Sequence, residues 1–225
     1  MIRTKSILGS ILALVGVTAA GLTAHADDLV QTFNFNDATP TYNVTFNLFN
    51  SNIGVLNSVT YEFDATNVSN FSVFNLNPSP ATGVDIKSVA HVDVFGPIGL
   101  SQYLSEDITA EAANYTANGF LSQVTGVTGN TTDTASVALG DLSAYQAPGG
   151  GPLAGQLVIN ITPGTYQGTT PPGVFGNLDS TSTTGTLKIH YNFTRVVTPE
   201  PGTWALLAAS SVMGVAGIRR RRRSA

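Results

Sequence analysis

The chain has 225 residues, no cysteine and a formal net charge of −4 at pH 7. The charge is unevenly distributed, because residues 27–198 hold thirteen acidic residues against three basic ones, a formal charge of −10. Such an acidic segment cannot build the Lys/Arg face that phosphate binding needs, so nucleic acid is excluded as a partner. The lack of cysteine excludes disulfides, a thiol nucleophile and Cys-ligated metal centres.

The first 26 residues have the pattern of a secretory signal peptide. Arg3 and Lys5 supply a positive n-region, and residues 7–17 form a short apolar run. Ala24-His25-Ala26 then has the small-x-small pattern that signal peptidase accepts. We expect signal peptidase to cleave after Ala26 and the rest of the chain to be exported. An uncleaved membrane anchor is the alternative, but it would need a longer apolar run.

Residues 27–198 alternate between apolar and polar side chains, as β-strands with one wet face do. Leu187, Ile189, Tyr191 and Phe193, for example, alternate with polar residues. Strands are expected at about 30–35, 42–48, 58–63, 68–76, 86–95, 120–127, 133–139, 157–161 and 187–193. Because no long amphipathic helix separates them, the pattern predicts one all-β domain, an antiparallel, jelly-roll-like β-sandwich.

Turn-forming residues separate these strands and predict three long loops, at 77–83, 146–155 and 163–185. One segment allows two interpretations. Ser105 followed by acids and alanines is typical of a capped short helix, but residues 105–114 could equally form the edge of a sheet.

Polysaccharide hydrolysis requires two carboxyl groups about 5 to 9 Å apart, and two pairs of acids are the closest candidates in sequence. Glu62 and Asp64 share a face of one predicted strand, with Cβ atoms about 6.6 Å apart. Glu106 and Glu111 form the second pair. Acids on the wet face of a strand also keep a sheet soluble, so we expect no enzymatic role.

Calcium is the one cofactor for which the sequence offers ligands, and no other is expected. Asn34, Asn36 and Asp37 place hard oxygen atoms within one turn. Further oxygen ligands are available at Asn130, Asp133 and Asp179. No twelve-residue calcium loop is present, and Asn and Asp favour turns without any ion.

The histidines of the body carry no catalytic pattern. His91 and His190 fall at polar positions of separate strands, and we expect both to be solvated. No Gly-x-Ser-x-Gly elbow, glycine-rich phosphate loop or His-Glu-x-x-His element occurs in the sequence.

Residues 199–225 have the composition of a membrane-sorting tail. Pro199-Glu200-Pro201 precedes an apolar run at 203–218, and five arginines follow: Arg219, Arg220, Arg221, Arg222 and Arg223. A helix over 203–218 would be about 24 Å long, slightly shorter than the hydrocarbon core of about 30 Å. The long arginine side chains compensate at one end and hold it in the cytoplasm, which leaves the body outside. We therefore expect a short transmembrane helix.

This tail resembles the PEP-CTERM sorting signal of exported bacterial proteins. The resemblance lies in Pro199-Glu200-Pro201, Trp204-Ala205-Leu206-Leu207, a helix ending in Gly214-Val215-Ala216-Gly217, and the terminal arginines. It implies that exosortase, an integral-membrane cysteine transpeptidase, recognises and cleaves the tail in bacteria that also make exopolysaccharide. An ordinary tail anchor, the alternative, would not require Pro-Glu-Pro at this position.

The body resembles the choice-of-anchor E domains of PEP-CTERM proteins. This resemblance lies in Phe46-Asn47-Leu48-Phe49 followed by residues 53–60, in Tyr166-Gln167-Gly168-Thr169, and in a last strand at 186–194. It implies an exported β domain that is presented by interchangeable anchors, and it assigns no active site.

Two functions are open at this point. The first is a non-catalytic cell-surface or extracellular-matrix protein, moored in the membrane during sorting and associated with exopolysaccharide. The second is a secreted polysaccharide-active hydrolase or a carbohydrate-binding module. Exposed aromatic rings would serve sugar stacking, and the candidates are Tyr42, Tyr61, Tyr103, Tyr145 and Tyr166.

Overall fold

The computed structural model describes residues 26–97, 101–150 and 153–196. Within them lie ten strands: β1 (Ala26–Asn36), β2 (Thr41–Asn47), β3 (Phe49–Asn50), β4 (Gly54–Asn75), β5 (Ala81–Phe95), β6 (Gln102–Ala117), β7 (Leu121–Ser136), β8 (Gln146–Ala147), β9 (Ala154–Tyr166) and β10 (Val174–Arg195). Two short 3₁₀ helices, η1 (Leu139–Tyr145) and η2 (Pro148–Gly150), flank β8.

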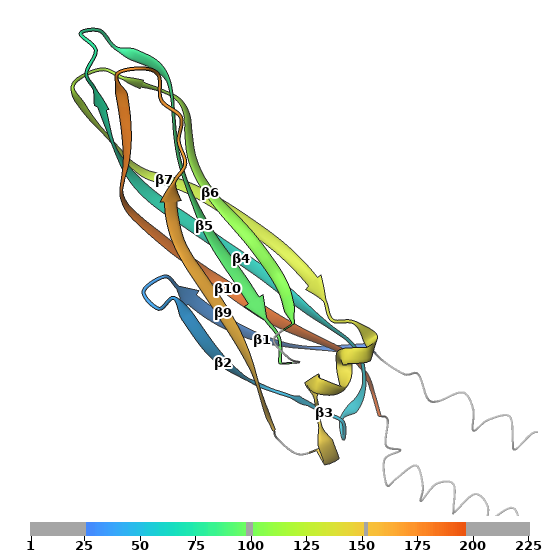
Figure 1. The fold of residues 1–225 in the computed structure, drawn as a ribbon. Helices are drawn as coiled ribbons and strands as arrows, with labels where there is room; N and C mark the ends of the chain where they lie inside the picture. The colour runs from blue at the N-terminus through green and yellow to red at the C-terminus, as the bar shows by residue number, and fades with distance from the viewer. Residues whose placement is uncertain (1–25, 98–100, 151–152, 197–225) are drawn as a thin grey trace, which may run out of the picture. The chain divides into compact units, whose positions relative to one another are not determined.

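The eight long strands form two four-stranded sheets (Figure 1). Sheet A has the order β1-β10-β4-β7, and sheet B has the order β2-β9-β5-β6. The pairs β1–β10, β4–β7, β2–β9, β5–β9 and β5–β6 are antiparallel. Along the chain, successive long strands change sheet except from β5 to β6, which is the strand order of a jelly roll. The predicted all-β antiparallel sandwich is confirmed.

The inner faces of both sheets supply the core, because large apolar side chains at alternate positions turn inward. On β10, Leu187, Ile189 and Tyr191 are fully buried, whereas Lys188 and His190 between them remain partly exposed. A large apolar cluster fills the sandwich from this region to β3, and a smaller one lies around Phe71, Ile86 and Val174.

Six strands are longer than predicted: β1, β4, β5, β7, β9 and β10. The predicted strands at 58–63 and 68–76 form the single strand β4, which continues through the buried polar residues Asn67 and Ser69 and a bulge after Ser69. Those at 120–127 and 133–139 form the single strand β7, which ends at Ser136. The predicted loop at 163–185 is wrong for residues 163–166, which belong to β9, and for residues 174–185, which belong to β10. The predicted loops at 77–83 and 146–155 are wrong where β5 begins at Ala81, at β8, and where β9 begins at Ala154.

Residues 105–114, for which a short helix and a sheet edge were both open, lie entirely in β6. β6 is an edge strand of sheet B and pairs with β5, with His91 opposite Asp107 and Lys87 opposite Glu111.

The sandwich body has two distinct ends, which we call the base and the tip. At the base, Ala26 pairs with Thr194, so the described chain begins and ends there. At the tip lie the turns 76–80, 118–120 and 167–173, which connect β4 to β5, β6 to β7 and β9 to β10. β10 runs its 22 residues from the tip to the base, a length of about 70 Å at about 3.3 Å per residue.

Candidate functional site: clamped histidines and a polar hollow

The outer face of sheet A carries a compact charged cluster. His190 on β10 lies between Asp28 of β1, 3.2 Å from its Nδ1, and Glu62 of β4, 3.1 Å from its Nε2. Lys188 donates from Nζ to the other carboxylate oxygen of Glu62. The hydrogen bond from Lys188 is the main cause of a lowered pKa of Glu62. Glu62 is therefore held ionised and cannot act as a general acid at neutral pH.

Beside this cluster, the same face has a shallow hollow of about 380 Å³. It lies over Thr184, Gly185 and Thr186 of β10, with β1 on one side and β4 on the other. Its lining residues are Asn34, Phe35, Asp64, Thr66, Thr184, Gly185 and Thr186. A second hollow of about 210 Å³, between β4 and β7, shares Asp64.

Asp64 is the one charged group that both hollows have in common. Among the residues that the structure describes, no hydrogen bond or ion pair holds its side chain, and that side chain is exposed. The hollow thus offers an open carboxylate, the Asn34 amide and threonine hydroxyls. Such neutral and singly charged hydrogen-bonding groups can engage the hydroxyls of a polar, uncharged ligand.

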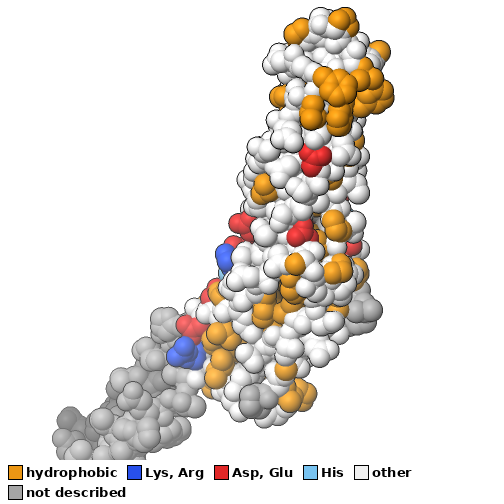
Figure 2. Space-filling view, turned by 90° about the vertical axis from the view of Figure 1, so that its left-hand side faces the viewer, with side chains coloured by type: hydrophobic (Ala, Val, Ile, Leu, Met, Phe, Trp, Pro, Cys, Tyr) orange, Lys and Arg blue, Asp and Glu red, His pale blue; other side chains and the backbone are white. Residues whose placement is uncertain are grey.

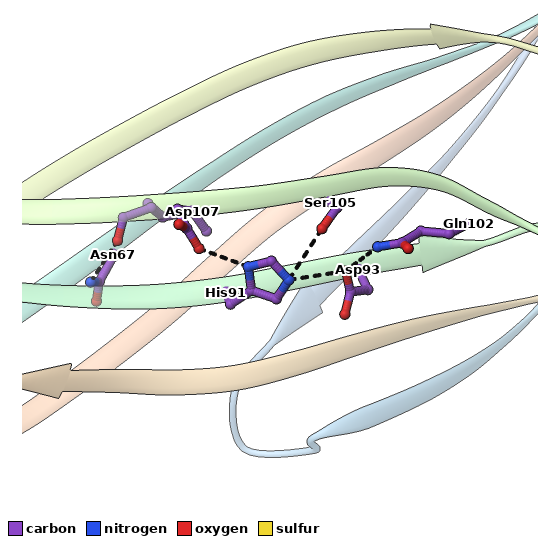
Figure 3. A network of polar contacts seen from close by, with 7 residues as sticks. Asn67, His91, Asp93, Gln102, Ser105 and Asp107 are labelled. Carbon is purple, nitrogen blue, oxygen red and sulfur yellow. Dashed lines mark hydrogen bonds and ion pairs between the residues drawn. The ribbon is translucent and has the colours of Figure 1, made fainter.

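Sheet B carries a matching cluster on its own outer face (Figure 3). His91 of β5 lies between Asp107 of β6, 2.7 Å from Nδ1, and Asp93, 3.0 Å from Nε2. Gln102 donates to Asp93 at 2.6 Å, and the Ser105 hydroxyl lies 3.3 Å from Nε2. The hydrogen bond to Asp107 is the main cause of a raised pKa of the His91 ring.

Ser105, His91 and Asp107 have the connectivity of a nucleophile, a base and an orienting acid. However, Asp93 also occupies Nε2, and both carboxylates favour the protonated ring, which cannot take a proton from Ser105. The cluster is a clamped ion-pair network.

Both histidines were expected to be solvated, and this expectation was incomplete. His91 and His190 are partly exposed, but each lies between two carboxylates, one at each ring nitrogen. The partner acids come from neighbouring strands or from the next outward position on the same strand. Only the strand register, which places His91 opposite Asp107, would have revealed the first of these contacts from sequence.

The structure places the two predicted carboxylate pairs differently. Glu62 and Asp64 lie on the outer face of β4 as predicted, but Glu62 is held in ion pairs with Lys188 and His190. Glu106 and Glu111 do not converge, because Glu106 follows the inward positions of β6 whereas Glu111 is exposed opposite Lys87. Burial, and then a hydrogen bond with Asp133 of β7, raises the pKa of the Glu106 carboxyl.

Four of the six residues proposed as calcium ligands accept hydrogen bonds from protein donors, and a fifth, Asp133, makes a hydrogen bond with Glu106. Asn36 Oδ1 accepts from Ala38 N and the Tyr42 hydroxyl, and Asp37 accepts from Thr183 N. Further acceptor contacts are Asn130 with Thr66 and Asp179 with Ser72. Within residues 26–97, 101–150 and 153–196, no three acidic or histidine side chains converge as a metal site would require. Asn34 lines the polar hollow instead.

The targeting residues lie almost entirely outside the described residues. Ala26 is the exposed first residue of β1. Ala24, Pro199-Glu200-Pro201, the apolar run 203–218 and the arginines 219–223 fall outside. In the part of the chain that is described, no helix combines the length and the apolar character needed to cross a bilayer.

The fold and these clusters define a class: an all-β, antiparallel sandwich with polar outer faces. No protein-family model and no curated protein matches the chain. Solved structures with some likeness are the T=1 particles derived from infectious bursal disease virus (10% identity, TM-score 0.17) and that virus's Gt strain (11%, 0.15). The matches cover 76% and 81% of this chain but only 41% and 49% of the viral chains. At such scores the likeness carries no inference.

Proposed function

We propose that this chain is an exported, non-catalytic bacterial protein of the cell surface or extracellular matrix. Residues 1–26 direct export, and exosortase sorts the protein through residues 199–225. During sorting, the helix at 203–218 anchors the protein in the membrane. The jelly-roll body then contacts exopolysaccharide through the outer face of sheet A.

The polar hollow beside the Glu62 cluster is the observation that supports this proposal. It is shallow, open and lined by one carboxylate, one amide and three threonines. A shallow polar surface of this kind suits the hydroxyl-rich face of a polysaccharide better than a small ligand, which proteins usually enclose in a largely apolar pocket. The clamping of Glu62 also removes the carboxylate pair on which a hydrolase at this face would depend.

Binding of the protein to exopolysaccharide from the producing bacterium tests the proposal. We expect Asn34→Ala with Asp64→Ala to lower retention at least fivefold, because both hydrogen-bonding walls of the hollow are lost. Glu111→Ala is the matched control, since it removes one exposed carboxylate from the opposite sheet. Equal retention of all variants would show that the hollow is not the binding site. If the unmodified protein is not retained, the polysaccharide contact itself is refuted.

The hydrolase alternative keeps one observation in its favour. Glu106 lies beside Asp133 where the edge strands β6 and β7 approach, and its raised pKa suits a general acid. Against it, the two carboxyls are hydrogen-bonded to each other, closer than the 5 to 9 Å of a glycosidase pair. If this pair hydrolyses polysaccharide, Glu106→Gln abolishes release of reducing sugar while leaving binding intact. Full activity in that variant, or no activity in the unmodified protein, would dismiss the pair.

A further inference from the structure

The tip of the sandwich exposes a group of large apolar side chains, on turns that contain no charged residue. Other exposed apolar residues, such as Val55 and Leu139, lie at the base. Figure 2 shows hydrophobic side chains gathered at this end of the body. Four of them stand out by exposed fraction: Phe120 (66%), Leu76 (58%), Phe175 (57%) and Leu121 (50%). Leu76 and Phe120 lie in the turns 76–80 and 118–120, whereas Leu121 and Phe175 lie at the starts of β7 and β10. These residues are far apart in the sequence and meet at the tip only because of the fold.

The tip is a braced surface. Asn75 N donates to Phe120 O and Leu76 N to Gly173 O, which joins the three connections through their backbones. The buried Asn75 amide also donates to Ser79 O and Ala117 O. The Phe120 ring meets Phe74 edge-on, with centroids 6.1 Å apart. Because these bonds fix the turns, the apolar side chains can be buried against a partner at little further entropic cost.

The tip is also free of charge. Residues 74–84, 112–132 and 164–178 contain no Asp, Glu, Lys, Arg or His, although the body as a whole carries a formal −10. The acids nearest to the tip are Asp179, about 13 Å beyond Phe175 along β10, and Asp85, which accepts hydrogen bonds from Thr169 and from Asn114 N. Two tips in contact would keep the two Asp179 carboxylates more than 20 Å apart, well beyond the Debye length of about 8 Å at physiological ionic strength.

We propose that the tip is a self-association surface, at which two copies of this chain meet end to end. A second copy fits the charge distribution, because contact through the sides would bring acidic outer faces together, and contact through the tips would not. The four side chains expose on the order of 400 to 500 Å² per copy, about half the area of a stable interface. The contact is therefore weak between dissolved molecules and becomes populated where many copies are displayed together.

Such a contact is two-fold symmetric, so each residue near its centre lies opposite the same residue of the second copy. The cysteine-free chain allows a clean test with one introduced thiol. Gly119→Cys places it in the β6–β7 turn at the tip, and Gly140→Cys in η1, at the other end of β7, is the matched control. Both glycines are exposed, and a Cβ at either site meets no atom within 4 Å.

The experiment is mild oxidation of the full chain, purified in detergent at high concentration, followed by non-reducing electrophoresis. We expect Gly119→Cys to give at least tenfold more disulfide-linked dimer than Gly140→Cys. Phe120→Ser or Phe175→Ser, each added to the Gly119→Cys variant, should lower that yield severalfold. Phe120 lies in the β6–β7 turn and Phe175 at the start of β10, so a local folding defect in one variant leaves the other informative.

Equal yields from the two cysteine positions, or no dimer from Gly119→Cys, would overturn the proposal. Sedimentation with phosphatidylcholine vesicles distinguishes the main rival occupant. Binding to vesicles that depends on Phe120, without dimer from Gly119→Cys, would assign the tip to a lipid surface instead. The inference does not require the exopolysaccharide contact, which concerns the outer face of sheet A and has a separate assay.

Discussion

Asn67 on β4 donates from Nδ2 to the backbone carbonyl of Ile108 on β6, 3.2 Å away, and so joins the two sheets through the interior. Its Oδ1 accepts from Thr181 at 2.7 Å and from Ser69 at 3.3 Å. These buried polar groups, with Ser88 and Thr183, lie between the two apolar clusters. The hydroxyls of Ser88 and Thr183 have no hydrogen-bond partner among the described residues, so the bonds of Asn67 are what fix here which residues of the two sheets face each other.

The first prediction concerns this layer. Asn67→Ala removes the side-chain donor to the Ile108 carbonyl and the shared acceptor of the Ser69 and Thr181 hydroxyls, which keep only their 3.3 Å contact with each other. A buried polar group that loses its partner costs about 1 to 3 kcal/mol. We expect the free energy of unfolding, measured by urea denaturation, to fall by about 2 to 4 kcal/mol. Asn177→Ala removes an exposed amide from the same sheet and should stay within about 0.5 kcal/mol. Similar losses in both variants would contradict the role of the layer.

The second prediction follows from the clamp on His91. A folded-state pKa above that of the unfolded chain stabilises the fold fully below about pH 6.5, and the contribution disappears as pH rises through the folded pKa. Asp107→Asn should lower the His91 pKa more than Asp93→Asn, because the Asp107 hydrogen bond is the larger cause. NMR titration of the His91 ring protons measures this pKa in both variants and in the unmodified protein. A His91 pKa at or below 6.5 in the unmodified protein would refute the clamp.

The strands that sequence could predict are those whose inward positions hold large apolar residues. Leu187 to Phe193 alternates in hydropathy as well as in burial, and it was found correctly. In residues 174–185 the alternation in burial shifts by one residue at Asp179-Ser180, which are both exposed. The inward positions there include Thr183 and Gly185, and the outward ones Asn, Ser and Thr. These residue types also mark turns, so the pattern predicted a loop.

The candidate site was predictable only in part, because its contacts depend on register. Glu62 and Asp64 were placed on one outer face by alternation alone, and the structure has them there. The contact of His190 with Asp28 joins residues 162 positions apart, through the pairing of the first long strand with the last. No local pattern encodes that pairing. It follows from the order of strands within the sheets, which single-sequence periodicity does not determine.

The third prediction uses a close approach of the two sheets at their edge. A Cβ at Gly129 of β7 would overlap the backbone carbonyl of Thr109 on β6, and backbone atoms within two ladders cannot yield easily. We expect Gly129→Ala to destabilise the fold by about 1 to 3 kcal/mol, as overpacking does. Gly119→Ala, whose Cβ meets open space, is the control and should be nearly neutral. A neutral Gly129→Ala in thermal unfolding would show that the edges separate readily.

The last prediction concerns alkaline pH and the buried phenols. The hydroxyls of Tyr61 and Tyr145 lie 2.6 Å apart in the core, and burial is the largest cause of raised pKa values for both, as it is for Tyr191. Above about pH 10 the unfolded chain releases these protons and the folded chain keeps them, so stability must fall as pH rises from there. Ultraviolet titration of the seven tyrosines should show these three ionising only together with unfolding. Tyr145→Phe removes one of these phenols and should make the loss of stability with rising pH less steep. Ionisation of all seven tyrosines near pH 10 with the fold intact would contradict the buried arrangement.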